Sequence, residues 1–170
     1  MNQKQTALAT GIFLLPLPVT LLIPGWLLRL EKHFTIGGEA EGWVRGILVV
    51  AGMVSILVGI FLAWRTVFLF YSAGDGTPVP WNPPKKFVVL GPYRYVRNPM
   101  MLGVHAVLLG ESILFGSLAI LGWFVVFGAG MHLFICCYEE PGLEKRLGDD
   151  YRRYKSHVPR WIPRLKPWGG

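Results

Sequence analysis

Four apolar stretches separated by polar segments dominate the chain, at residues 7–28, 46–64, 100–115 and 117–138. A helix needs about 20 apolar residues to cross the hydrocarbon core of a bilayer. Three stretches approach or exceed that length, and 100–115 is short for a full span. The pattern predicts an all-α, polytopic membrane bundle of about four transmembrane segments.

The two N-terminal stretches differ in regularity. Pro16, Pro18 and Pro24 predict a kinked or broken first helix. A signal peptide is the alternative for this stretch, but no convincing small-residue cleavage site follows it, so a retained helix is favoured. The second stretch is apolar through residues 67–71, which predicts that its helix tilts or projects beyond the membrane.

Two polar segments remain. Residues 72–95 hold Pro78, Pro80, Pro83 and Pro84, which forbid regular helix and favour extended structure; a simple linker is the alternative. In the C-terminal segment, side chains at i, i+4, i+8 and i+11 predict one amphipathic helix ending at Val158-Pro159. It would lie on the membrane surface or on the loop before Tyr95. Its apolar face consists of Leu143, Leu147, Tyr151 and Tyr154.

The block LGPYRYVRNPMMLG, residues 90–103, joins these parts. Gly91-Pro92 indicates a tight turn, and Asn98-Pro99 is typical of a helix start. We expect the Asn98 side chain to cap this helix by accepting from its first amides. Free amides, the helix dipole and nearby arginines would together suit an anionic group.

Further motifs follow this block in order. They are Glu139-Glu140-Pro141, Leu147-Gly148-Asp149-Asp150-Tyr151, Tyr154-Lys155 and Val158-Pro159-Arg160. Together with GPYRYVRNPMMLG, the set resembles the isoprenylcysteine carboxyl methyltransferase and phospholipid methyltransferase family, from about residue 83 to 164. Members are integral membrane enzymes that use S-adenosylmethionine. The sequence departs from the family at Asn98, where the family more often has His.

The resemblance implies S-adenosyl-L-methionine as cofactor and S-adenosyl-L-homocysteine as product. This cofactor carries both signs of charge, and Arg97 and Tyr93 on one side with Glu139 on the other would complement it. The expected cofactor-binding residues are Phe87, Val88, Val89, Leu90, Tyr93, Arg97, Asn98, Pro99, Met100, Met101 and Glu139. No His/Cys/Asp cluster has metal-ligand spacing, so no metal is expected.

Glu139 and Glu140 end the fourth apolar stretch, where adjacent carboxylates at a helix C-terminus are unfavourable. Either they pair with Arg94, Arg97 or the tail arginines, or at least one faces a cationic ligand. Which carboxylate would point inward stays open. Arg97, Asn98, Glu139 and Glu140 are the candidate catalytic residues.

Three ionisable residues lie inside apolar stretches, where such groups are functional candidates. His132 lies seven residues before Glu139, which predicts the same helix face. It would line the substrate cavity, as would His105, or be a buried histidine bonded to a backbone carbonyl. Glu111 lies near the far end of its stretch, where interfacial solvation explains it. A non-enzymatic four-helix transporter or binder would instead use Glu111 as its coupling group.

Composition narrows the class of protein. With 52% hydrophobic and 16% charged residues, the chain is too apolar for an ordinary soluble domain. Membrane orientation and anionic headgroups explain the net charge of +7 better than nucleic acid does. Cys136 and Cys137 are expected to be free thiols. Lysine and arginine positions predict an inner or cytoplasmic membrane protein with its active site and both termini in the cytoplasm.

These observations lead to one hypothesis. Residues 1–170 form a single methyltransferase domain, with two N-terminal transmembrane helices (1–71), a catalytic half (72–164) and a tail (165–170). The acceptor is lipidic or small, and isoprenylcysteine carboxyl O-methylation is the closest reaction. Phospholipid amine N-methylation and small-thiol S-methylation are the alternatives. The partners would be the bilayer and the acceptor, without nucleic acid or an obligate protein partner.

Overall fold

The computed structural model describes residues 16–31, 42–73 and 89–169, and these parts contain helices and no strand. The predicted all-α class is confirmed. The elements are the π-helical turn η1 (Pro18–Leu22), α2 (Ile23–Leu30), α3 (Gly42–Ala73), the 3-10 helix η2 (Gly91–Arg94), α4 (Pro99–Phe115), α5 (Leu118–Phe134), the π-helical turn η3 (Ile135–Glu139), α6 (Glu140–Leu147) and α7 (Asp149–His157).

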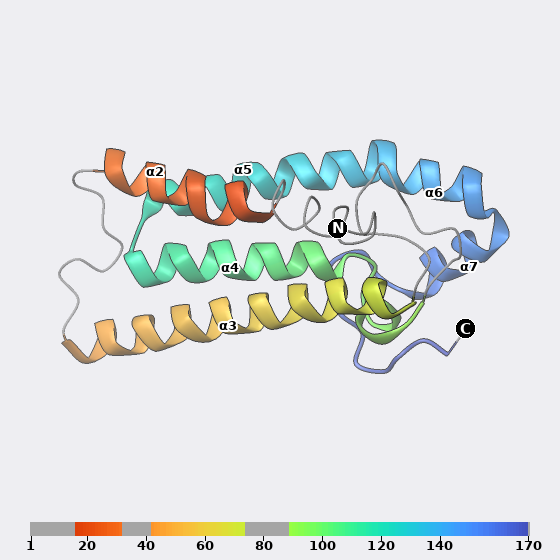
Figure 1. Ribbon diagram of the computed structural model, residues 1–170, viewed down its shortest axis with the longest axis horizontal. Coiled ribbons are helices and arrows are strands. Elements are labelled where there is room, and N and C mark those ends of the chain that lie inside the picture. Colours follow the sequence, from red (N-terminus) through yellow and green to blue (C-terminus); the bar gives the residue numbers. More distant parts are fainter. Residues whose placement is uncertain (1–15, 32–41, 74–88, 170) are drawn as a thin grey trace, which may run out of the picture.

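The long helices lie side by side with α4 in the centre (Figure 1). Helix α3 packs along one side of α4, and α5 with α2 lies on the other. In the described part of the chain, Gly42–Leu69 and Leu118–Leu147 are long and apolar enough to cross a membrane, and Pro18–Leu30 and Pro99–Phe115 are shorter apolar helices. The protein is therefore membrane-associated.

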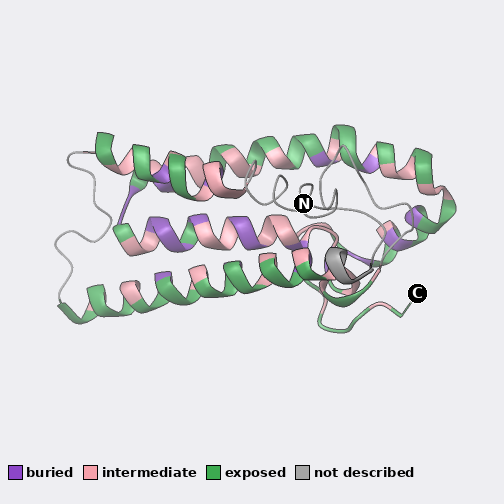
Figure 2. Cartoon of the chain, viewed as in Figure 1, coloured by how far each residue is buried: buried purple, intermediate pink, exposed green. Residues whose placement is uncertain are grey.

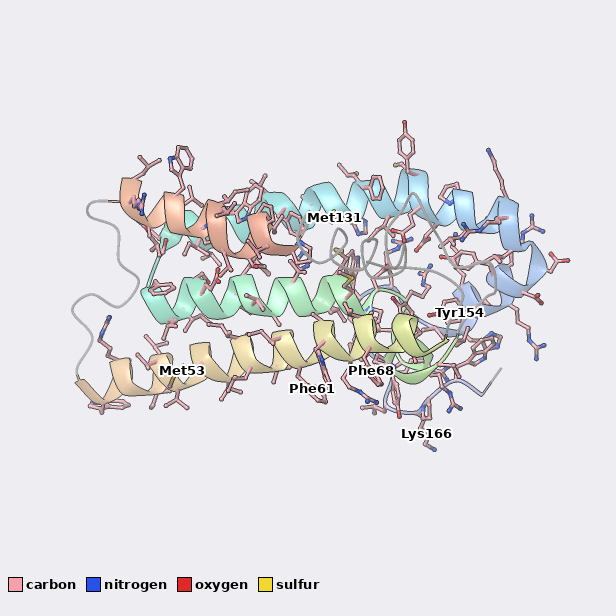
Figure 3. All side chains as sticks on the ribbon, viewed as in Figure 1. Met53, Phe61, Phe68, Met131, Tyr154 and Lys166 are labelled. Carbon is pink, nitrogen blue, oxygen red and sulfur yellow. The ribbon has the colours of Figure 1, made fainter. Side chains whose placement is uncertain are left out.

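Helices α3 and α4 differ in how far their side chains are buried. Figure 2 shows buried residues concentrated on α4, whereas α3 is mostly exposed. The exposed side chains of α3 are large and apolar, and Met53, Phe61 and Phe68 project from the side of the helix that faces away from α4 (Figure 3). A continuous apolar surface of this kind matches lipid rather than water.

Glycines let α3 and α4 approach closely. Cβ atoms built at Gly59 and Gly110 would lie 2.5 Å from the Gly103 carbonyl oxygen and 2.6 Å from the Gly52 carbonyl oxygen. The Ser55 hydroxyl donates to the Ala106 carbonyl oxygen at 2.7 Å across the same contact. Gly52 and Gly59 of α3 therefore lie directly against Gly110 and Gly103 of α4, the kind of close approach that residues without a side chain permit.

The small residues of α5 behave differently. Space is open around Gly122 and Gly130, so neither lies at a helix contact. Gly128 does face a neighbour, because a Cβ there would lie 2.9 Å from Nε2 of His105. Only one of the three glycines therefore lies at a helix contact.

The proline-rich first stretch is irregular, as expected from Pro16, Pro18 and Pro24. The irregularity takes the form of the π-helical turn at Pro18–Leu22, which continues into α2 without a break. The indole of Trp123 donates to the Val19 carbonyl oxygen at 3.1 Å, tying this turn to α5. Residues 7–15 of the predicted helix lie outside the described residues.

Three predicted boundaries are corrected. Helix α3 extends to Ala73, so the apolar continuation is confirmed and the first residues of the expected extended segment are helical. The helix that includes α5 does not end at Glu139-Glu140, because η3 and α6 continue it to Leu147. The single amphipathic helix is wrong: Gly148, with φ +60°, separates α6 from α7.

Two carboxylates, those of Glu31 and Glu111, lie among the apolar helices. Glu31 accepts from the Ser117 hydroxyl and from the Ala119 amide at 3.2 Å, at the N-terminus of α5, where the helix dipole favours a negative charge. Glu111 is only 8% exposed, and its Oε2 has no hydrogen-bond partner among the described residues. Interfacial solvation was therefore the wrong explanation for Glu111.

We predict that Gly59→Ala destabilises the fold by about 1–3 kcal/mol, because the added methyl group meets the α4 backbone. Gly46→Ala, on the same helix, is the matched control, since a Cβ there has open space around it. Denaturant unfolding in detergent measures both. Equal stability of the two variants would contradict the packing described for α3 and α4.

Candidate functional site

Three segments far apart in sequence meet at one end of the bundle. They are the loop before α4 (residues 89–98), which we call the motif loop, the passage from α5 into α6, and the C-terminal segment after α7 (residues 158–169), which we call the tail from here on (Figure 1). This end of the bundle is where the motif residues gather. Its geometry decides which of them can act together.

The loop begins with a sharp change of direction. Gly91 has φ +54°, a left-handed conformation that favours glycine, and the tight turn expected here is the 3-10 helix η2. Val96 is buried in the irregular stretch that follows, and Pro99 is the first residue of α4. The helix start predicted at Asn98-Pro99 is therefore confirmed.

Asn98 does not cap α4 with its side chain, so that expectation is wrong. Its Nδ2 instead donates to the Arg160 carbonyl oxygen, at 3.4 Å. The tail lies close enough to draw this side chain away from the helix amides. Asn98 therefore links the motif loop to the tail.

Backbone hydrogen bonds hold the tail along the loop. The amide of Arg97 donates to the Pro159 carbonyl oxygen at 3.0 Å, the amide of Arg164 to the Tyr95 carbonyl oxygen at 2.9 Å, and that of Trp168 to the Arg94 carbonyl oxygen at 2.9 Å. The Arg94 Nε also donates to the Trp168 carbonyl oxygen at 2.7 Å. The tail thus forms one wall of the site.

Glu140 is the centre of a buried ion cluster, which we call the Glu140 cluster: Glu140, Arg97, Arg160 and Lys155. Arg97 Nη1 lies 2.5 Å from Oε1 of Glu140, while Arg160 donates through Nε to Oε1 and through Nη2 to Oε2, both at 2.8 Å. Lys155 Nζ is 3.5 Å from Oε2. The Glu140 side chain is only 3% exposed.

The sequence left open whether Glu139 and Glu140 pair with arginines or face a cationic ligand, and the cluster answers this for Glu140. Glu140 pairs with Arg97 and with a tail arginine, as one interpretation held, whereas Arg94 does not take part. The pKa values of Lys155 and Arg160 are both raised, that of Lys155 chiefly by its hydrogen bond to Glu144 and that of Arg160 chiefly by its hydrogen bond to Glu140. Both cations stay charged throughout the neutral range.

Glu139, by contrast, is exposed. Among the described residues it has neither an ion pair nor a side-chain hydrogen bond of the kind that holds Glu140. The π-helical turn η3 ends at Glu139, and such turns shift the helix register by one residue. Consecutive side chains on a helix point about 100° apart, so only one of the two carboxylates can enter the cluster, and the shifted register makes it Glu140. A role for Glu139 in cofactor binding stays a prediction.

A tyrosine-rich layer from α7 packs against the motif loop. Tyr151, Tyr154 and Val158 are buried against Val89, Leu143, Leu147 and Trp168. The Tyr154 hydroxyl donates to the Tyr93 carbonyl oxygen at 2.8 Å, and Figure 3 shows Tyr154 at the end of the bundle near the tail. The predicted apolar face is confirmed, and it packs on the loop.

Burial controls the ionisation of these tyrosines. It raises the pKa of Tyr151 to about 12 and raises the pKa values of Tyr93 and Tyr154 further above their usual range. The three phenols are therefore neutral hydrogen-bonding groups at any physiological pH. Tyr93 can contribute a hydrogen bond to a ligand, but no charge.

His105 and His132 converge on Trp161, a residue that sequence reasoning missed. The Trp161 indole donates to Nδ1 of His132 at 2.9 Å, and its ring centroid lies 5.8 Å from that of His105. His105 also packs against Phe124 and Phe127. The backbone-carbonyl bond considered for His132 occurs at His105 instead, whose Nδ1 lies 2.7 Å from the Met101 carbonyl oxygen.

The other expected residues divide into three groups. Phe87 and Val88 lie outside the described residues. Val89 and Leu90 line a cavity of about 290 Å³ with Arg94, Trp168 and Gly169. Pro99, Met100 and Met101 form the first turn of α4, with Pro99 buried and both methionines half-buried. The structure thus brings Tyr93, Arg97, Asn98 and Glu140 to one end of the bundle.

We predict that Glu140→Gln destabilises the protein by about 3–5 kcal/mol, because it leaves Arg97 and Arg160 partly buried without a counter-charge. Asp149→Asn is the control, since its ion pair with Arg152 is exposed and contributes little. Chemical unfolding of both variants measures the difference. A Glu140→Gln protein as stable as Asp149→Asn would show that the cluster is not a structural link.

Comparisons with known proteins now bear on this site. A family model described as phospholipid methyltransferase matches residues 47–150, which include most of α3, the motif loop and Glu140. The chain is also similar to an uncharacterized protein of Haemophilus influenzae, with 41% identity over 64 residues that are 37% of this chain and 100% of that protein. No solved structure matches the chain.

Proposed function

Because this chain belongs to the phospholipid methyltransferase family, whose members are membrane methyltransferases, we propose that it transfers a methyl group from S-adenosylmethionine to a lipidic acceptor. The observation that carries the proposal is the meeting of the motif loop, the Glu139-Glu140 pair and the tail at one end of the bundle. Methyl transfer would take place there, at the cytoplasmic face of an inner or cytoplasmic membrane.

The charges at this end suit a ligand that carries both signs. Glu139 is an exposed carboxylate beside a buried cluster, and it is available for the ammonium or sulfonium of the cofactor. Arg97 keeps one buried guanidinium nitrogen, Nε, without a hydrogen-bond partner among the described residues. Together with the first amides of α4, it would favour the cofactor carboxylate.

The chain's contribution to the reaction is mainly position. S-adenosylmethionine supplies an activated methyl group, and displacement needs the acceptor aligned with it. The Glu140 cluster holds the loop and tail in fixed relation, which supports orientation and a preorganised charge distribution. Asn98 and Arg97 would contact the ligands directly. A carboxylate acceptor needs no base, whereas an amine must lose a proton.

The acceptor would enter sideways from the bilayer. The lipid-facing surfaces of α3 and α5 are apolar, and the His105, Trp161 and His132 cluster lies between α4, α5 and the tail. We propose that these two histidines line the acceptor path. An isoprenylcysteine carboxylate is the first choice of acceptor, and a phospholipid amine or a small thiol is the alternative. The domain would act alone, with both termini in the cytoplasm.

The direct test is binding and transfer with purified protein. Calorimetric titration with S-adenosylmethionine and S-adenosylhomocysteine should show a single site for both. Labelled cofactor with a prenylcysteine, phosphatidylethanolamine or a small thiol then identifies the acceptor. Absence of cofactor binding in the folded protein would refute the proposed activity, whatever acceptor is offered.

We predict that Glu139→Gln weakens cofactor binding about tenfold, the effect of losing one charge-assisted contact, and leaves stability nearly unchanged. Asp150→Asn, which removes an exposed carboxylate from α7, is the matched control. Titration calorimetry compares the two variants with the parent. Parental affinity in Glu139→Gln would remove Glu139 from the site.

A further inference from the structure

A second and larger cavity lies beside the motif loop, on the side that faces α3. Its volume is about 460 Å³. Its lining includes Leu62 and Arg65 of α3, Arg94 of the motif loop, Leu102 of α4, and Pro163 and Pro167 of the tail. None of these residues is among those expected to bind the cofactor.

Hydrogen bonds and helix packing hold the walls of this cavity in place. The amide of Arg164 bonds to the Tyr95 carbonyl oxygen, and the amide of Trp168 bonds to the Arg94 carbonyl oxygen. These two bonds fix the tail residues Pro163 and Pro167 opposite the loop. Helices α3 and α4, which supply the remaining wall, are locked together by their glycines.

The charged side chains that line the cavity are positive. Of the described residues that line the cavity, Arg65 and Arg94 are the charged ones and none is acidic. Among the described residues, Arg65 has no acidic partner. An anionic group is the ligand that these two arginines favour, and phosphate is one of the anions that a planar guanidinium group binds through two parallel hydrogen bonds.

The position of the cavity favours a phospholipid headgroup, rather than a soluble phosphate, as the ligand. Arg65 follows Trp64 near the end of an apolar helix whose outer side chains, including Phe61 and Phe68, face away from α4 (Figure 3). Leu62 and Leu102 add apolar wall from two membrane helices. Arginines at such a boundary attract anionic headgroups, while apolar walls accept the glycerol and the start of an acyl chain.

We propose that this cavity binds the phosphate headgroup of an anionic phospholipid, which fastens the loop and tail to α3. The bound lipid is a ligand of the fold, separate from the methyl acceptor. Arg65 is the defining residue, because Arg94 also lines the smaller cavity beside Val89 and Leu90. The proposal does not depend on methyl transfer, so it can fail or hold independently of the proposed function.

The test is native mass spectrometry of the full chain titrated with phosphatidylglycerol, and with phosphatidylcholine as the zwitterionic comparison. We expect one tight phosphatidylglycerol site, weakened about fivefold in Arg65→Gln. Arg152→Gln is the matched control, because it removes the same charge from an exposed position on α7. Leu62→Trp, which fills the cavity and keeps its charges, should weaken phosphatidylglycerol binding in the same way. If Arg65→Gln does not fold, this variant is the test, and parental affinity in folded Leu62→Trp would overturn the proposal.

Parental affinity for phosphatidylglycerol in folded Arg65→Gln would overturn the proposal, and so would equal binding of phosphatidylcholine. Inorganic phosphate and glycerol phosphate distinguish a soluble anion from a lipid, and either one binding as tightly as phosphatidylglycerol would contradict the lipid assignment. Displacement of phosphatidylglycerol by S-adenosylhomocysteine would assign the cavity to the cofactor and would likewise overturn it.

Discussion

The carboxylate of Glu140 is the constraint on which the functional end of this protein depends. A carboxylate removed from water is costly unless cations and hydrogen bonds compensate it. Here Arg97 from the motif loop and Arg160 from the tail both bind Glu140, and Lys155 of α7 adds a third positive charge. A single buried charge therefore requires three distant segments to be in place at once.

The rest of the architecture can be understood from that requirement. Arg97 stands two residues before Pro99, so the cluster fixes where α4 begins relative to α6. The glycine contact between α3 and α4 gives the loop a rigid base, and the tyrosine layer fills the space beneath it. A site assembled in this way holds the loop and the tail in one fixed relation, which is the preorganisation that the proposed methyl transfer requires.

Much of the fold could be predicted from local pattern. Apolar length and Asn98-Pro99 placed α4 almost correctly, and the apolar run through residues 67–71 correctly indicated that α3 continues. The face made by Leu143, Leu147, Tyr151 and Tyr154 was also correct, because burial preserves that side even across the break at Gly148. These features depend on residues near one another in sequence.

The features that escaped prediction depend on tertiary contacts. The π-helical turn η3 inserts one residue into the helix, so Glu140, eight residues after His132, takes the position that a regular helix gives to Glu139. Consecutive tail residues accordingly contact Glu140 and His132. Asn98 turned to the tail instead of capping α4 for the same reason: nothing local in the sequence records where the tail will lie.

Hydrogen exchange at the tail and loop tests this account most directly. The amides of Arg97, Arg164 and Trp168 donate to carbonyl oxygens across the loop–tail contact, so they should be protected in the parent protein. In Glu140→Gln the three should lose protection together, while amides within α4 keep theirs. Protection that survives at all three amides in Glu140→Gln would contradict the claim that this carboxylate holds the site together.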